Sequence, residues 1–378
     1  MKRILLAPDS FKGTMSSEDI CQIMKGVIHR LSPDTETVSI PVADGGEGSV
    51  ECFLHADGGI KKYVSVQGVY GERMKSFYGL LADKRTAVIE MAACAGLPLA
   101  EGRLNPERTT TYGVGELLLE AARQGAKRII LGLGGSATND GGCGAAAAAG
   151  VRFFDGLGKS FVPTGGTLGE IARIDVSGLD SALYGVKIIA MCDIDNPMYG
   201  AKGAAYVFGP QKGADEEAVR RLDSGLRRLN DVMRRDLGTD YSKLPGGAAA
   251  GAMGAGMAAF FSAKLQMGID TVLDTVGFDR LLQRSQLVFT GEGKIDSQSL
   301  GGKVVIGVSR RAKMQNVPVI SVVGAIGEGF EGAYAEGVTS IFSINREPMD
   351  FSLSRHHSKE NLAVAMENIM RLVLRLYS

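Results

Sequence analysis

The segment from Leu131 to Gly142 has the residue types of a phosphate-binding loop with a carboxylate beside it. It follows the short apolar run 129–131 and contains, in order, Gly134, Gly135, Ser136, Asn139 and Asp140. Glycine lets backbone N–H groups come close to phosphate oxygens. A nearby acid would repel a bare phosphate, so its presence suggests a bridging Mg²⁺. The segment therefore predicts contact with a phosphate group and a metal ion.

Other segments repeat this pairing of an acid with glycine, asparagine, serine or lysine. They are 7–13, 43–48, 192–197 and 290–303, and a further glycine-containing segment, 208–213, carries a lysine but no acid. In an open α/β sheet, the loops after several strands converge on one crevice at the carboxyl ends of the strands. Any single acid could simply cap a helix or begin a turn. We do not expect every one of these acids to have such a structural role. They should therefore lie close together in one site.

A dinucleotide-binding turn is the main alternative for the first segment. Gly132, Gly134 and Ala137 follow a strand-like run with the spacing of that turn, and Asp155 lies about 20 residues further on. However, Asn139 and the residues after it would interrupt the helix that should begin there, and an acid beside a pyrophosphate is unfavourable. An NAD-dependent oxidoreductase acting on a small hydroxy acid stays as the second hypothesis.

Strand-like runs and helical periods alternate along the chain and predict the elements that position these loops. The runs 3–7, 128–133, 287–290 and 317–323 are mostly apolar, which is typical of strands covered on both faces. An apolar stripe from Ile20 to Leu31 follows Ser16 and Ser17, both candidate helix caps. The pattern predicts an α/β fold in which a parallel, doubly wound sheet forms one domain.

The middle of the chain reads differently and predicts a second, inserted α/β domain with a mixed sheet. We assign 1–62, 105–148 and 285–378 to the doubly wound domain and 63–104 with 149–284 to the inserted one, with the active site in the cleft between them. The glycine-alanine tract 245–256 favours close helix packing; a backbone contribution to ligand binding is the other interpretation.

Composition narrows the class of protein. The 378 residues are 45% hydrophobic and 22% charged, with 42 Lys and Arg against 42 Asp and Glu. No overall field draws the chain to nucleic acid or an acidic membrane surface. Five scattered cysteines without a CxxC pair indicate reduced thiols, and no signal peptide or membrane span is visible. We expect a soluble, cytoplasmic protein; a homodimer stays possible.

The motifs in 7–13, 43–48, 131–142, 192–197, 208–214 and 290–303 strongly resemble those of the class I glycerate kinase family, in that family's order and over nearly the whole chain. The resemblance implies transfer of the γ-phosphoryl group of ATP to a hydroxyl of D-glycerate, usually giving 2-phosphoglycerate. It also implies a Rossmann- or flavodoxin-like domain with a second α/β domain. Cys192 and Val305 stand where relatives often have threonine and proline, and neither removes a charge.

Phosphoryl transfer needs an in-line hydroxyl, a metal ion, donors for the phosphates and a proton acceptor. The resemblance does not assign these roles residue by residue, so they are hypotheses. The candidate catalytic residues are Asp193 as the favoured base, Asp44 as the next choice, and Lys12, which would receive the glycerate carboxylate or a phosphate oxygen. The candidate substrate and phosphate contacts are Asp9, Ser10, Lys12, Gly134, Gly135, Ser136, Asp140, Gly291, Gly293 and Lys303. The candidate Mg²⁺ ligands are Asp195, Glu292 and Asp296.

Overall fold

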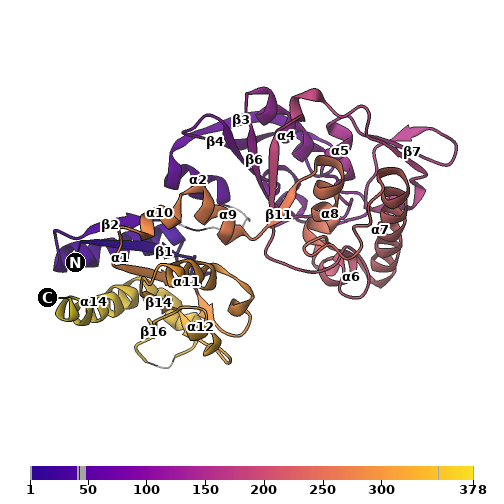
Figure 1. Cartoon of the computed structure of the whole chain (residues 1–378). Helices are drawn as coiled ribbons and strands as arrows, with labels where there is room; N and C mark the ends of the chain where they lie inside the picture. The colour runs from indigo at the N-terminus through magenta and orange to yellow at the C-terminus, as the bar shows by residue number, and fades with distance from the viewer. Residues whose placement is uncertain (1, 41, 43–47, 348, 378) are drawn as a thin grey trace. The chain divides into compact units, whose positions relative to one another are not determined.

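The computed structural model describes residues 2–40, 42, 48–347 and 349–377. Its contacts divide the chain into two compact units. Unit 1 comprises residues 1–44 and 267–378, and unit 2 comprises residues 45–266 (Figure 1). Both ends of the chain therefore belong to unit 1, and the whole of unit 2 is a single insertion into it.

Unit 1 contains a five-stranded sheet in the order β16-β14-β12-β1-β2, with every neighbouring pair parallel. The strands are β1 (Arg3–Pro8), β2 (Glu36–Ser39), β12 (Leu287–Gly291), β14 (Val319–Val323) and β16 (Ser340–Ser343). Counted within the unit, this is the 2-1-3-4-5 order of flavodoxin-like sheets. The central strands β12 and β14 are buried along their whole length, as their apolar sequences predict.

Helices cover both faces of this sheet. The helices of unit 1 are α1 (Ser17–Leu31), α9 (Gly268–Thr275), α10 (Phe278–Leu282), α11 (Val304–Met314), α12 (Gly332–Ala335), α13 (Phe351–Ser354) and α14 (Ser358–Leu376). The helices α1 and α14 pack side by side and share a core with the sheet (Figure 1), whereas α11 contacts β1 and β12. The cap expected at Ser16 is confirmed, because its side chain accepts a hydrogen bond from Asp19 N.

Unit 2 is built on a six-stranded mixed sheet in the order β11-β10-β6-β5-β4-β3. Its strands are β3 (Gly59–Gln67), β4 (Arg73–Leu81), β5 (Thr86–Glu90), β6 (Arg128–Gly132), β10 (Lys187–Met191) and β11 (Lys264–Gln266). The last four pair in parallel, and β4 is antiparallel to both of its neighbours, β3 and β5. A small antiparallel sheet joins β7 (Arg152–Phe154), β8 (Ser160–Phe161) and β9 (Arg173–Asp175). The predicted α/β fold with parallel and mixed sheets is therefore confirmed.

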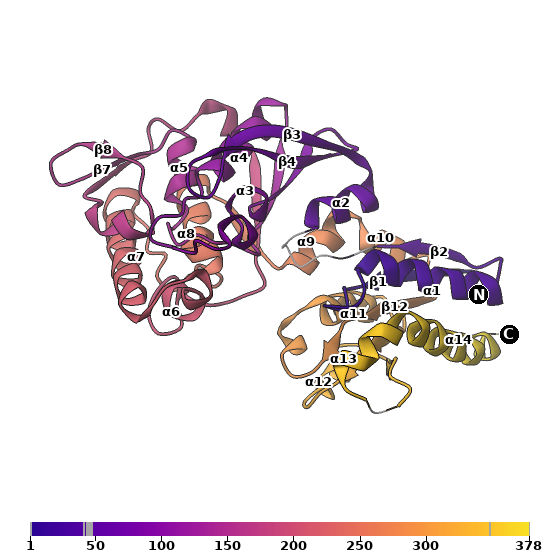
Figure 2. The ribbon, with the colours of Figure 1, turned by 180° about the vertical axis from the view of Figure 1, so that it is seen from behind.

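The helices of unit 2 are α2 (Ser49–Asp57), α3 (Ala92–Ala95), α4 (Tyr112–Arg123), α5 (Cys143–Ala148), α6 (Ala204–Phe208), α7 (Glu216–Leu237) and α8 (Ala249–Phe261). One apolar core joins α4, α5 and α8 to the sheet, and α7 lies beside α8 (Figure 2). Within the described part of the chain, no helix combines the length and the apolar character needed to cross a bilayer.

The boundaries of the two units differ from the domain boundaries that we predicted from the sequence. We expected 105–148 in the doubly wound domain, but β6 pairs with β5 and β10 and so belongs to the mixed sheet of unit 2. Residues 48–62, which we also expected in the doubly wound domain, belong to unit 2, and residues 267–284, with α9 and α10, belong to unit 1 instead of the inserted domain. The physical reason is that an apolar run shows that a strand is buried on both faces, but not which sheet it joins.

The glycine-alanine tract is a packing element. A Cβ on Gly251 would lie 2.0 Å from Thr138 O, and one on Gly256 would lie 2.1 Å from Gly141 O. A left-handed turn at 250–252 bends α8, and Gly251 has φ of +68° within it. The close packing that we expected is confirmed, and the partner is the segment around Gly141 and Thr138.

Candidate active site

In unit 1, the loops after β1 and β12 lie next to each other. In the sheet, β2 is the neighbour of β1 on one edge and β12 is its neighbour on the other, so the order of the strands reverses at β1. Ligands of such sheets bind at the carboxyl ends of the strands at this reversal. Asp9 N donates a hydrogen bond of 2.8 Å to Gly291 O, and the Cα of Gly293 faces the backbone of Phe11 and Lys12. Asp9 and Ser10 are half-buried, and Lys12 is exposed.

Glu292 is the buried acid of this edge. Only 6% of it is exposed, and its Oε1 has no hydrogen-bond partner among the described residues. Burial raises the pKa of Glu292 to about 7, a hydrogen bond from Ser299 opposes the rise, and the charge of Asp9 adds to it. A buried carboxylate oxygen without a donor is the kind of hard ligand that Mg²⁺ accepts.

The remaining candidates of unit 1 follow Glu292 closely. Asp296 forms an ion pair of 3.1 Å with Lys294 and accepts a hydrogen bond of 2.9 Å from Gln298 N. The hydrogen bond from Lys294 is the largest cause that lowers the pKa of Asp296. Lys303 stands at the start of α11, and its charge acts on Glu292. The structure thus brings these predicted residues together at one edge of the sheet.

In unit 2, the carboxyl ends of β5, β6 and β10 are neighbours. Met91 N donates to Gly132 O at 3.1 Å, and Leu133 N donates to Met191 O at 3.2 Å. The glycine loop after β6 therefore lies between the ends of β5 and β10. Gly134 is half-buried, Gly135 is exposed with φ of +73°, and Ser136 is 7% exposed. The backbone at 134–135 is the part of the loop that a ligand can reach.

Asp140 is fully buried, so the structure gives it a different role from the direct ligand contact that we expected. Its Oδ2 accepts hydrogen bonds from Thr111 N and Oγ1, both 2.8 Å, and from Gly144 N at 3.2 Å. Its Oδ1 accepts one of 3.1 Å from Gly142 N. Burial raises the pKa of Asp140, and these hydrogen bonds oppose the rise. The carboxylate fastens the starts of α4 and α5 together beneath the glycine loop.

The dinucleotide alternative loses its structural basis. That turn requires a helix directly after the strand, but β6 ends at Gly132 and α5 begins only at Cys143. Asp155, the acid at the matching distance, accepts hydrogen bonds of 2.9 Å from Leu157 N and Lys159 N in the turn between β7 and β8. It shapes a hairpin rather than a ribose site.

The loop after β10 holds two further candidates. Asp193 is half-buried, and Asp195 is exposed. Asn196 fixes the loop, since its Nδ2 donates a hydrogen bond of 2.8 Å to Lys202 O and its carbonyl accepts one of 3.1 Å from Ala248 N. Asp44 lies outside the described residues. Asp195 belongs to unit 2 and Glu292 to unit 1, so their combination as metal ligands stays a prediction; no cluster of three or more metal-ligating side chains occurs among the described residues.

Two buried ionisable residues were missed by the sequence analysis. Lys212 is 2% exposed, and Glu90, the last residue of β5, is 3% exposed. Burial lowers the pKa of Lys212 to about 7 and raises that of Glu90 to about 6. The segment 208–213 had been recognised, but nothing in it marks its lysine as buried. An acid at the end of an apolar strand was the available signal for Glu90.

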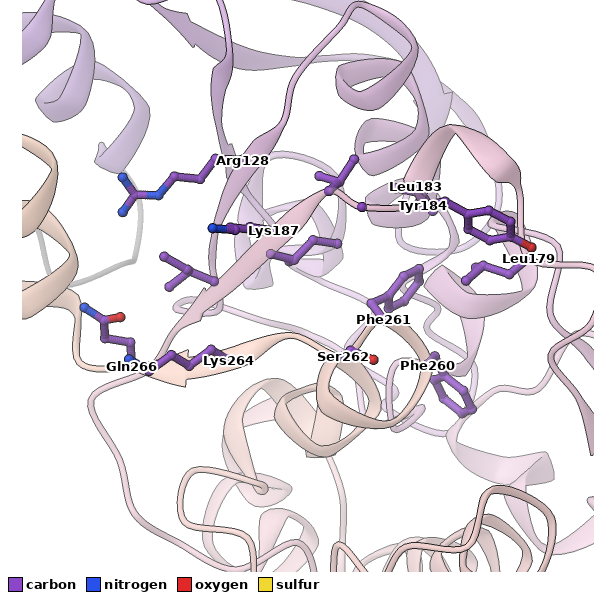
Figure 3. A pocket seen from close by; sticks show the side chains of 14 residues that line it. Arg128, Leu179, Leu183, Tyr184, Lys187, Phe260, Phe261, Ser262, Lys264 and Gln266 are labelled. Carbon is purple, nitrogen blue, oxygen red and sulfur yellow. The ribbon is translucent and has the colours of Figure 1, made fainter.

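Unit 2 also contains a cavity of about 640 Å³ that none of these loops lines. Figure 3 shows the side chains that line it. Its lining includes the first residues of three parallel strands, Arg128, Lys187 and Lys264. The glycine loop and Asp193 follow the opposite, carboxyl ends of β6 and β10. None of the predicted site residues lines this cavity.

Comparisons with known proteins match one family over nearly the whole chain. The model of the "Glycerate kinase family" matches residues 4–374. "Glycerate kinase" of Bacillus cereus (strain ATCC 10987) is 42% identical over 368 residues, which cover 97% of each chain. "Glycerate 2-kinase" of Escherichia coli (strain K12) is 40% identical over 369 residues, again 97% of each. A crystal structure described as "putative glycerate kinase 2 from Salmonella typhimurium LT2" is 40% identical, with a TM-score of 0.88 over 99% of this chain and 98% of that one.

The fold, the loops and these matches define an enzyme of the ATP-dependent kinase class. Within that class, the chain belongs to the glycerate kinase family.

Proposed function

We propose that this protein phosphorylates D-glycerate with ATP and that the product is 2-phosphoglycerate. The family match over residues 4–374 supports the reaction most strongly, because the matched segments include the acidic and glycine loops at the carboxyl ends of both sheets. The name "Glycerate 2-kinase" of the Escherichia coli relative favours the hydroxyl on carbon 2.

The reacting hydroxyl must lose a proton and meet the γ-phosphorus in line. Asp193 is our candidate for the base, since it is a half-buried carboxylate directly after β10 and beside the glycine loop. Lys12 is exposed next to the Glu292–Gly293 turn and would hold an anionic group of a substrate. The backbone of Gly134 and Gly135 would donate to phosphate oxygens, because glycine leaves it accessible.

Glu292 would hold Mg²⁺, and the oxygen without a partner is the observation that fits it to a metal. Asp296 is the second candidate, and its carboxylate would have to leave the ion pair with Lys294 to bind the metal. Magnesium sites commonly use only one or two carboxylates together with substrate phosphates. When bound, the ion would neutralise charge that develops on the phosphates.

We further propose that the two units act on the same pair of substrates. Asp193 and the glycine loop belong to unit 2, whereas Lys12 and Glu292 belong to unit 1. The roles proposed here draw on both sets, since the base and the phosphate donors come from unit 2 and Lys12 and Glu292 come from unit 1. A cytoplasmic location and a homodimer stay predictions from the sequence.

Phosphorus NMR of the product from ATP, Mg²⁺ and D-glycerate tests the proposal. We expect the resonance of 2-phosphoglycerate together with ADP. A 3-phosphoglycerate resonance would overturn the choice of hydroxyl, and the absence of any phosphoglycerate would overturn the reaction.

Asp193→Asn tests the base. We expect kcat to fall about 100-fold or more, because general bases contribute roughly that much. Asp231→Asn is the matched control, since Asp231 is an exposed acid of α7 in the same unit. Turnover of Asp193→Asn at the control's rate would show that another group accepts the proton.

A further inference from the structure

Lys212 is a buried lysine whose amino group contacts no carboxylate among the described residues. Its Nζ donates a hydrogen bond of 2.9 Å to Ser136 Oγ and one of 2.7 Å to Thr138 O. No described carboxylate forms an ion pair with it, and Asp140 acts on it only as a nearby charge. Taking an ammonium group out of water is costly, so a lysine in this setting calls for a specific reason.

The turn that carries Lys212 is built to point it inward. The short helix η4 (Pro210–Lys212) begins with proline and ends at Gly213, which has φ of +93°. A Cβ on Gly213 would lie 2.7 Å from both Cβ and O of Leu104, so only glycine fits there. Gly209 O accepts hydrogen bonds from Lys212 N at 2.9 Å and Ala214 N at 3.1 Å. The segment Gly209–Ala214 is therefore a closed turn with one long side chain directed into unit 2.

Both hydrogen bonds of Lys212 end on the glycine loop after β6. Backbone hydrogen bonds hold the loop on either side of Ser136, since Leu97 N donates to Gly135 O at 2.9 Å and Ala137 N donates to Ala95 O at 2.9 Å. Lys212 fixes the side chain of Ser136 and the carbonyl of Thr138. The accessible backbone at Gly135 thus stands directly before the residue that Lys212 holds.

The surroundings of this contact are polar and incompletely paired. Thr138 Oγ1 and both amide atoms of Asn139 are buried without a hydrogen-bond partner among the described residues. Each such group costs about 1–3 kcal/mol of stability. Burying the amino group of a lysine costs free energy, and the two acceptors of Lys212 are neutral groups rather than a carboxylate. A function of the glycine loop that Lys212 holds would explain why this cost is accepted.

We infer that Lys212 is a positioning residue of the phosphoryl-transfer site, which acts through Ser136. Its ammonium group holds the Ser136 hydroxyl and the Thr138 carbonyl, and so fixes the Gly134–Gly135 backbone that receives the phosphates of ATP. The inference rests on the proposed function, since it takes the glycine loop as a phosphate contact.

Steady-state kinetics of Lys212→Met, Ser136→Ala and the double variant test it. In either single variant we expect KM for ATP to rise at least about fivefold and kcat/KM for ATP to fall at least about tenfold. A change that only reduced the amount of folded enzyme would lower kcat and leave KM unchanged. Lys159→Met is the control, because Lys159 is an exposed lysine of the turn between β7 and β8, and it should stay within about twofold of wild type.

The double variant shows whether the two residues act as one. If Lys212 works through Ser136, kcat/KM for ATP of the double variant should be no more than about threefold below that of the less active single variant. The reason is that the effects of residues in one network are not additive. Losses that multiply, or a Lys212→Met enzyme with the KM for ATP of the control, would overturn the inference. If Lys212→Met does not fold, Ser136→Ala alone decides, and an unchanged KM for ATP overturns it.

Failure of the proposed function can be told apart from failure of this inference. If the wild-type enzyme does not phosphorylate glycerate, the proposed function is wrong, and the same variants are then compared by calorimetric titration with Mg-ATP. Weaker binding by at least about fivefold in Lys212→Met and Ser136→Ala supports positioning of the loop. Binding as tight as in wild type and in Lys159→Met overturns it.

Discussion

Replacing Glu90 by glutamine should change how the stability of the protein depends on pH. Glu90 ends β5, is 3% exposed, and accepts a hydrogen bond of 2.6 Å from Val50 N at the start of α2. Burial is the main cause that raises its pKa to about 6, and the hydrogen bonds from Val50 and Gly48 oppose the rise. In the unfolded chain the group should return to the ordinary value of a glutamate, about 4.3.

The sign follows from proton binding. Between these two pKa values the folded protein holds a proton that the unfolded chain has released, so the free energy of unfolding falls as the pH rises. Each pKa unit corresponds to about 1.4 kcal/mol, which gives a loss of about 2 kcal/mol across the window from about pH 4.3 to about pH 6. The stability contribution is fully present below the lower value and is lost above the upper one.

Glutamine does not titrate, so Glu90→Gln lacks this loss. The free energy of unfolding of the variant, relative to wild type, should therefore rise by about 2 kcal/mol between pH 4.5 and pH 7.5. Urea unfolding at one-unit pH steps, in buffer without ATP or Mg²⁺, measures the difference. Glu101→Gln, a change at an exposed acid, is the control and should give a flat difference. An equally flat difference for Glu90→Gln would refute the reasoning.

Two further changes have separate outcomes. Glu292→Gln should raise the Mg²⁺ concentration needed for half-maximal turnover by about tenfold or more, since one hard oxygen ligand is replaced by a weaker amide; an unchanged Mg²⁺ titration would remove Glu292 from the metal site. Gly251→Ala should destabilise the protein by about 3 kcal/mol or more in urea unfolding, because its Cβ would lie 2.0 Å from Thr138 O at a φ of +68°. Gly169→Ala, with open space around the new methyl group, should stay within about 1 kcal/mol of wild type, and similar losses for both would contradict the packing argument.

The sequence located the loops better than it assigned them to sheets. Each predicted segment that the structure describes contains or follows a strand, except 208–213, and the strand-like runs at 3–7, 128–133 and 287–290 are β-strands. An apolar run indicates a strand that is buried on both faces. This is a property of the local sequence, so these strands could be predicted from the sequence. Membership of a sheet depends on partners far along the chain, and for that reason β6 was placed in the other domain.

The motifs by themselves determined the family, the reaction class and the order of acidic and glycine loops, because these depend on residue types at fixed spacing. Tertiary structure decided which polar residues are buried. It turned Asp140 from an expected ligand contact into a support for two helix starts, and it brought Lys212 to Ser136 across 76 positions of the chain. Burial and hydrogen-bond partners arise from contacts between distant segments, and these set the cost of each charge and therefore its role.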